Sequence, residues 1–195
     1  MDRSALLGMT IGAAVMFGFG SVWLVTGLVR GNRSPKWLYV ALLFAGVVLG
    51  GCIAILGAKA SGLPRDSDAL TQQQVDANRR VAQHFYVILG IEIAAIALSV
   101  AALNALRYPS YILSGIALIV AVHFFPLAAL FRAPVYYGAA LGGSAIGLVG
   151  FFIDDDGLRQ KVVGLSFGAL LWATASWIAG LGLISVSRMA TLPPS

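Results

Sequence analysis

Charged side chains are scarce in this sequence, and most of them lie between long apolar runs. Asp, Glu, Lys and Arg make up 11% of the 195 residues, and apolar side chains make up 59%. Soluble domains have about 25% charged and about 45–50% apolar residues. The composition therefore argues against a soluble domain and predicts a chain whose main solvent is the lipid bilayer.

Cysteine and the motifs of cofactor chemistry are also lacking. The single cysteine, Cys52, lies in an apolar run and has no partner for an intrachain disulfide. The sequence has no phosphate-binding loop, no lysine placed within a helix for a Schiff base, and no haem-type pair of histidines. We therefore expect no cofactor. The net charge of +5 comes from Lys and Arg that flank apolar runs, as expected next to lipid headgroups. It needs no nucleic-acid partner.

The apolar runs themselves predict the fold class, an all-α integral membrane bundle of six transmembrane helices. A helix needs about 20 apolar residues to cross the hydrocarbon core. Six segments qualify, and short polar breaks separate them: residues 5–29, 37–58, 81–105, 109–131, 135–153 and 162–187. We expect them to form a single domain over residues 1–195. Lys and Arg divide almost evenly between the two sides, so the positive-inside rule leaves the orientation open.

Apolar length alone does not explain two segments of the chain, residues 5–29 and 68–80. The first apolar run, 5–29, is much longer than the apolar core of a signal peptide, which has about 7–15 residues, and is predicted to be the first membrane helix. The polar segment 68–80 contains good helix formers and no Gly or Pro. It is predicted to extend the third helix out of the membrane.

A short motif, Arg-x-Pro-x-aromatic, opens three of the predicted helices, at residues 33–37, 107–111 and 132–136. Proline suits the first turn of a helix, and Arg, Trp and Tyr suit the headgroup level, which explains the motif physically. The alternative is internal duplication. A match between the second and fifth helices would make an inverted 3+3 repeat, an architecture typical of transporters.

Glycines four residues apart recur along four of the predicted helices. Such small-residue stripes let helix backbones approach closely. The pairs are Gly8/Gly12, Gly46/Gly50, Gly138/Gly142, Gly143/Gly147 and Gly164/Gly168, and a further small stripe runs through Ala175, Ala179 and Gly182. We expect packing within the chain, with a homo-oligomer interface as the alternative. The segments 81–105 and 109–131 lack such pairs, so we expect them to pack by a different rule.

Two ionisable residues lie inside those two segments. Glu92 is about 15 residues before the turn at Arg107-Tyr108, and His123 is about 15 residues after it. Equal rise along two antiparallel helices places the two residues at the same depth. An acidic residue at a helix centre costs about 2.5–3.5 kcal/mol to insert, so it usually has a partner. We therefore take Glu92 and His123 as a candidate ligand or proton site.

Three further residues complete the candidate site. Ser99 follows Glu92 by one heptad and shares its face, and Pro126 follows His123 by three residues, where a kink could open a cavity. His84 lies about two turns before Glu92, at the membrane boundary, and could mark the mouth of a path to it. That separation of about 12 Å is too long for His84 and Glu92 to share one metal ion.

The leading functional hypothesis is a small transporter or channel-like protein for a small solute, ion or proton. Histidine changes charge near neutral pH, which would make His123 a switch. Three alternatives stay open: a polar pair that only fixes helix register, a non-catalytic membrane subunit or scaffold, and an intramembrane enzyme on a lipid with Glu92 or His123 as general base. In size and hairpin layout the chain resembles small six-helix bacterial proteins, so we expect a bacterial cytoplasmic membrane.

Overall fold

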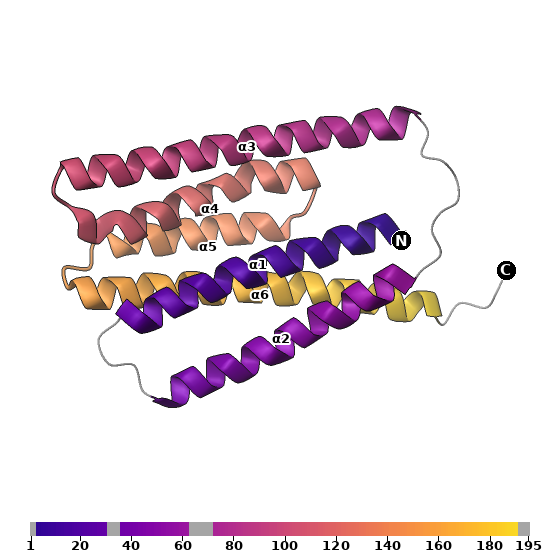
Figure 1. Cartoon of the computed structure of the whole chain (residues 1–195), viewed down its shortest axis with the longest axis horizontal. Coiled ribbons are helices and arrows are strands. Elements are labelled where there is room, and N and C mark those ends of the chain that lie inside the picture. The colour runs from indigo at the N-terminus through magenta and orange to yellow at the C-terminus, as the bar shows by residue number, and fades with distance from the viewer. Residues whose placement is uncertain (1–2, 31–35, 63–71, 191–195) are drawn as a thin grey trace. The chain divides into compact units, whose positions relative to one another are not determined.

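The computed structural model describes residues 3–30, 36–62 and 72–190, and all of its regular elements are helices (Figure 1). In chain order the elements are α1 (Arg3–Arg30), α2 (Lys36–Gly62), α3 (Gln72–Ala105), the short 3-10 helix η1 (Pro109–Tyr111), α4 (Ile112–Phe131), α5 (Val135–Gly150) and α6 (Asp156–Ala190). The all-α bundle predicted from the sequence is confirmed for these residues.

Five of the helices, α1, α2, α3, α4 and α6, are long and apolar enough to cross a membrane. The fifth in chain order, α5, has 16 residues and ends at Gly150, three residues before the predicted end. At about 1.5 Å per residue it is about 24 Å long, which is less than the hydrocarbon thickness of about 30 Å. The apolar helices indicate a membrane-embedded protein in which α5 is the shortest of the six.

Two helices continue beyond their apolar segments. The third begins at Gln72, so the predicted extension is confirmed for residues 72–80, and residues 68–71 lie outside the described part. The last helix begins at Asp156 rather than at 162. Its start is capped by Asp155, whose carboxylate accepts a hydrogen bond from the Leu158 backbone N–H at 2.6 Å. Apolar length marks the membrane crossing, whereas the cap marks the end of the helix.

The chain divides into two compact units, which we describe separately. Unit 1 comprises residues 1–22, 34–69 and 171–195, and unit 2 comprises residues 23–33 and 70–170. Both α1 and α6 contribute to both units. The expectation of a single domain over 1–195 stays a prediction.

Trp172 of α6 anchors the interior of unit 1. Its indole N–H lies 3.2 Å from the backbone carbonyl of Phe17 and 3.3 Å from the Ser21 hydroxyl, and its ring stacks on that of Phe17. A Cβ placed on Gly46 of α2 would lie 3.1 Å from the same indole ring. One aromatic side chain therefore contacts both α1 and α2.

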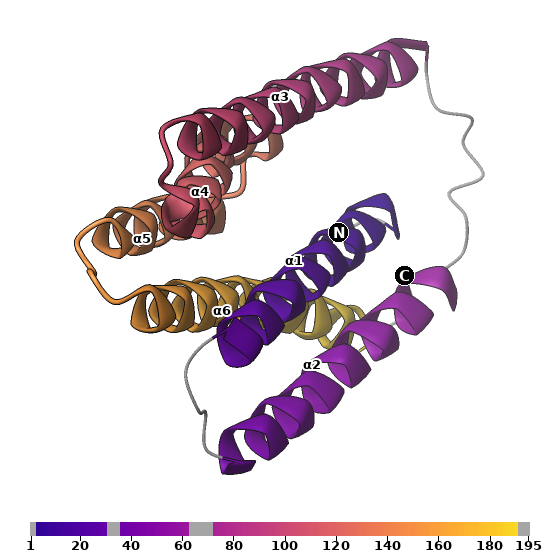
Figure 2. The same ribbon diagram turned by 60° about the vertical axis from the view of Figure 1, so that its left-hand side comes forward.

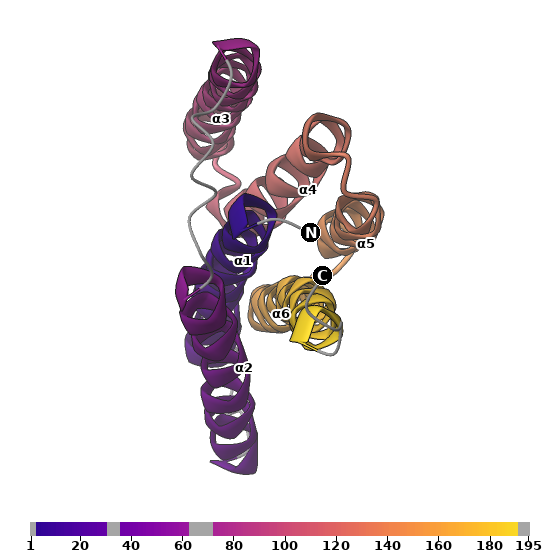
Figure 3. The same ribbon diagram turned by 90° about the vertical axis from the view of Figure 1, so that its right-hand side faces the viewer.

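Unit 2 contains α3, α4 and α5, with α4 between the other two (Figure 3). A Cβ on Gly147 of α5 would lie 2.8 Å from the backbone nitrogen of Leu118 in α4, and one on Gly143 would lie 2.8 Å from the Ala121 methyl group. Gly150 is pressed against Ser114 in the same way. The backbones of α4 and α5 approach closely because glycine leaves no side chain between them. By contrast, nothing lies within 4 Å of a Cβ on Gly138.

The expectation that the segment 109–131 packs by a different rule is wrong for its side toward α5. There α4 buries Ala117, Ala121 and Ala128, which are at most 2% exposed. The expectation counted only glycine pairs four residues apart, whereas α4 builds its small face mainly from alanine at helical spacing. On the α3 side the contacts include charged and aromatic side chains, and Gly115 of α4 lies close to the Ser99 hydroxyl.

The turns before and after α4 share one backbone geometry. Figure 2 shows α4 between α3 and α5. Arg107 and Arg132 have φ values of 64° and 51°, the only positive values among the described residues. The following amide donates to the carbonyl five residues back, Tyr108 to Leu103 at 2.8 Å and Ala133 to Ala128 at 3.1 Å. This is the pattern of a Schellman C-cap, in which the left-handed position is usually glycine.

Pro109 is the first residue of η1 and Pro134 is the N-cap of α5, so proline lies at a helix start in the second and third copies of the Arg-x-Pro-x-aromatic motif. The place of its arginine and aromatic residues at the headgroup level stays a prediction. Most of the first copy lies outside the described residues. The internal duplication stays a prediction.

Candidate functional site

One stripe of α3 makes the contacts with α4. Its members are seven residues apart, about two helical turns, and so lie on one face. The Phe85 ring lies 6.1 Å from the Phe131 ring, and the Ser99 hydroxyl lies 2.9 Å from where a Cβ on Gly115 would be. Glu92 lies between these two contacts and meets His123.

The Glu92–His123 contact is the centre of the candidate site. The imidazole Nδ1 lies 3.3 Å from Oε1 of the carboxylate, and the two side chains are 16% and 10% exposed for His123 and Glu92. The same Nδ1 lies 2.8 Å from the backbone carbonyl of Val120. A proton on Nδ1 is therefore held between a carbonyl and a carboxylate, which fixes the tautomer with Nε2 as the acceptor of the neutral ring.

This geometry allows the pair to take up protons. With a neutral imidazole and an ionised carboxylate the pair carries one negative charge, and protonation of Nε2 makes it neutral overall. A net charge is costly among apolar helices, whereas an ion pair in contact is much less so. Within the described part of the chain, Nε2 makes no hydrogen bond.

Aromatic rings enclose the pair on the side of the α4–α5 turn. The Phe124 ring lies 4.8 Å from the imidazole and stacks on Tyr136, which is 9% exposed. Phe131 lies 6.4 Å from the same Tyr136 and bridges to Phe85 of α3. The rings of Phe124 and Tyr136 are therefore buried beside the pair, whereas Phe131 is exposed.

The three other predicted residues of the candidate site differ in where they lie relative to the Glu92–His123 pair. Ser99 lies on the stripe that carries Glu92, about two turns toward the α3–α4 turn. Pro126 is exposed, and α4 continues as a helix across it. His84 is also exposed, and its Nδ1 lies 2.7 Å from the Arg80 carbonyl of its own helix. Thus the structure brings Glu92 and His123 into contact but gives neither Pro126 nor His84 a contact with them.

Sequence reasoning missed a buried cation. Arg159 is 1% exposed, although it is one of the basic residues assigned to a helix flank. Its guanidinium donates to the Ile153 carbonyl and to the Asp156 carboxylate, the latter at 2.8 Å, and lies 3.8 Å from the centre of the Tyr111 ring. The local signal was the Asp156–Arg159 spacing of three residues in a helix. The contacts with Ile153 and Tyr111 depend on the fold.

Arg159 fastens two turns of unit 2 at the same end. The carbonyl that it binds belongs to the α5–α6 connection, and the ring that it covers belongs to η1, just before α4. That ring stacks on Phe151 with an interplanar angle of 4°. The start of α4 and the start of α6 are therefore held together on the side of the α3–α4 turn.

These observations define a class of protein, a membrane-embedded all-α bundle with a partly buried carboxylate–imidazole pair between two of its helices. Comparison with protein families, with curated proteins and with solved structures yields no match.

Proposed function

We propose that this chain is a small transporter or channel-like protein for an ion, a proton or a small solute, and that Glu92 and His123 form its proton-responsive site. The observation that carries the proposal is the 3.3 Å contact between Nδ1 and the carboxylate, made from two apolar helices. The proposal includes a bacterial cytoplasmic membrane as the location.

The energetic cost of these residues supports a functional role. Glutamate at the centre of a membrane helix costs about 2.5–3.5 kcal/mol to insert, and intramembrane hydrogen bonds return only about 0.6 kcal/mol on average. Replacement of a buried ion pair by well-packed apolar side chains is often neutral or stabilising, so packing alone does not account for the pair. A pair that changes charge gives a membrane protein what an apolar pair cannot, a response to pH.

The direct test is pH-dependent flux in proteoliposomes. Glu92→Gln keeps the size of the side chain and removes its charge, so we expect the pH-dependent part of the flux to disappear. The matched control is Asp76→Asn, which makes the same change at an exposed position of the same helix. The control should retain flux. Unchanged flux in Glu92→Gln would exclude this function for the pair.

Stability separates a functional pair from a structural one. We expect Glu92→Leu, His123→Leu and the double variant to unfold within about 1 kcal/mol of the parent in a mixed-micelle titration, because intramembrane hydrogen bonds are weak. A coupling energy of about 2 kcal/mol or more in the double-mutant cycle would instead favour a pair that fixes helix register.

A second candidate function, a non-catalytic subunit or scaffold, is favoured by one observation. Gly138 of α5 is exposed, and nothing lies within 4 Å of a Cβ built on it. A small residue on an open face suits the close approach of another helix, from a second copy or a partner. A stoichiometric partner that co-purifies with the parent protein and is lost in Gly138→Leu would favour this function.

A further inference from the structure

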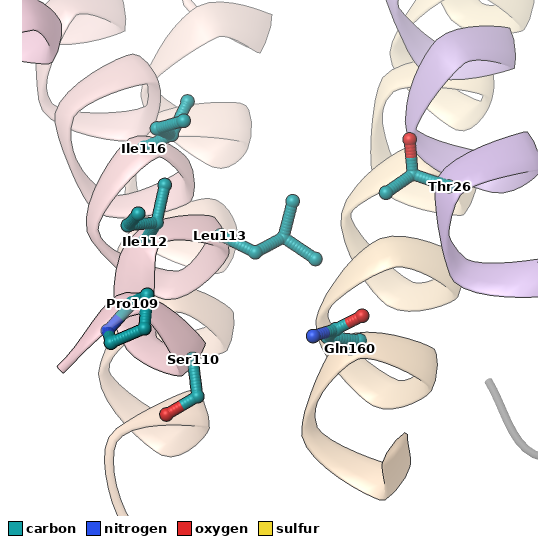
Figure 4. Close-up of a pocket in the computed structure, with 7 residues that line it drawn as sticks. All are labelled: Thr26, Pro109, Ser110, Ile112, Leu113, Ile116 and Gln160. Carbon is teal, nitrogen blue, oxygen red and sulfur yellow. The ribbon is translucent and has the colours of Figure 1, made fainter. Parts of the chain in front are cut away.

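We propose that a groove beside η1 is the water-filled entrance through which protons or small ions reach the Glu92–His123 pair, from the side of the membrane that carries the α3–α4 turn. This inference rests on the proposed function and adds to it the direction of access. The groove has a volume of about 400 Å³ and is lined by Thr26, Pro109, Ser110, Ile112, Leu113, Ile116 and Gln160, all within unit 2 (Figure 4).

The groove has two unlike walls. One wall is the start of α4 with η1, from which the Leu113 side chain reaches across, and the other carries Thr26 of α1 and Gln160 of α6 (Figure 4). The polar side chains of Ser110 and Gln160 make no hydrogen bond within the described residues. Both can therefore bind water.

The size and polarity of the groove suit water. Liquid water occupies about 30 Å³ per molecule, so 400 Å³ corresponds to about a dozen molecules. A cavity holds water when it is large enough and offers polar partners, and the Ser110 hydroxyl and the Gln160 amide supply them. The opening lies next to the turn between α3 and α4, where the helices leave the membrane core.

The wall of the groove formed by α1 and α6 is fixed by a close helix crossing. A Cβ on Gly27 would lie 2.7 Å from the backbone nitrogen of Leu165, and one on Gly164 would lie 2.6 Å from the Gly27 Cα. Gly27 follows Thr26 directly, and Gly164 is about one turn after Gln160. The two polar residues are therefore held on backbones in direct contact, which keeps the wall in place.

The α4 wall leads to the proton site. Ile116 precedes His123 by seven residues, so the two share one helix face and are about 10 Å apart along the axis. Ile112, Ile116 and His123 are all partly exposed, whereas the face of α4 toward α5 is buried. On the far side of His123, the rings of Phe124 and Tyr136 stack in the buried face toward α5, and the nearby Phe131 is exposed. The proposed entrance therefore leads from the groove to His123 along this face of α4.

The test uses the reaction of an introduced thiol with a membrane-impermeant cationic methanethiosulfonate. A Cys52→Ala background removes the only native cysteine. In that background, Asp154→Cys in the exposed α5–α6 connection reports which side of the proteoliposome carries the groove. We expect His123→Cys to be modified from this side and not from the other.

Blocking the groove should slow that reaction. Leu113→Trp places a larger side chain where Leu113 already reaches across the groove, and we expect modification of His123→Cys to become about tenfold slower because thiolate reactions require access of the aqueous reagent. Ala129→Trp, at an exposed position of the same helix outside the groove, should leave the rate unchanged.

Three results would contradict the proposed entrance. The first is modification of His123→Cys only from the opposite side, and the second is an unchanged rate in Leu113→Trp. The third is reaction only with a membrane-permeant maleimide, which would mean that lipid chains fill the groove. This measurement needs no flux, so its failure can be told apart from failure of the proposed function, which the Glu92→Gln flux experiment tests.

Discussion

The two faces of α4 pack against their neighbouring helices through different kinds of contact. Toward α5, Gly147 brings the α5 backbone against Leu118, and Gly143 contacts Ala121, so the interface is made of groups that cannot move independently of the helices. Toward α3, the contacts are made by the ends of side chains, Glu92 to His123 and Phe85 to Phe131. Backbone contact gives a rigid interface, whereas side-chain contact can rearrange by changes of rotamer.

This difference places the adjustable interface at the Glu92–His123 pair. No residue in the apolar window of α3 is buried, so only one face of the helix is engaged, and it is engaged by side chains. A site that changes charge must rearrange its contacts with each change. The α3–α4 interface can do so while α4 and α5 stay fixed together as a platform.

We expect the largest loss of unfolding free energy when a side chain is added at the rigid interface between α4 and α5. Gly147→Leu would place a side chain where a Cβ alone lies 2.8 Å from the Leu118 nitrogen, so α4 and α5 must separate. We expect a loss of about 3 kcal/mol in unfolding free energy, at the upper end of overpacking effects. The measurement is reversible unfolding by detergent titration.

The control for this variant lies on the same helix. Gly138→Leu adds the same side chain where nothing lies within 4 Å, and its effect should be below about 0.5 kcal/mol, as for other surface changes. Equal losses in the two variants would show that a leucine in α5 destabilises for a reason other than its contact with α4.

We expect an intermediate loss of unfolding free energy from Arg159→Met. Arg159 holds together the turns at one end of α4 and α5. The change keeps most of the apolar volume and removes the donors to the Ile153 carbonyl and the Asp156 carboxylate. We expect a loss of about 2 kcal/mol, since hydrogen bonds from charged groups contribute about 1.5–3 kcal/mol. The check is the same titration, with Lys161→Met, a partly exposed neighbour in α6, as the control. A loss no larger than that of the control would mean that Arg159 does not hold the two turns together.

We expect the smallest change in unfolding free energy from a substitution at the adjustable interface between α3 and α4. A Cβ from Gly115→Ala would lie 2.9 Å from the Ser99 hydroxyl, which can rotate away. Alanine also favours a helix over glycine by about 1 kcal/mol, so we expect a net change within about 0.5 kcal/mol. Gly147→Ala, which meets backbone atoms, should cost clearly more. Equal stability of the two alanine variants in the same titration would remove the distinction between the two sides of α4.

Much of the fold follows from one-dimensional patterns. Apolar length predicted where the helices lie, and counting residues from the Arg107 turn predicted that Glu92 and His123 have equal depth. Rotation about the helix axis could not be obtained in this way, because it depends on which faces pack. Only the structure shows that the stripe of Phe85, Glu92 and Ser99 is the one that faces α4.

The features that sequence reasoning missed are non-local. Arg159 lies between three aspartates and Lys161 in a polar stretch, which is typical of an exposed flank, but the fold places Tyr111 and the Ile153 carbonyl around it. The groove likewise combines residues of α1, α4 and α6, so no single segment of the sequence could have predicted it. By contrast, the start of α6 at Asp156 could have been found from its aspartate cap.

The paired turns at Arg107 and Arg132 also bear on how the protein is made. Each turn is closed by a hydrogen bond between residues five apart, and each is followed by a proline that starts the next helix. Contacts of such short range form early, because little chain entropy is lost in closing them. During synthesis, α3, α4 and α5 can therefore fold back on one another as soon as each emerges, before α6 exists.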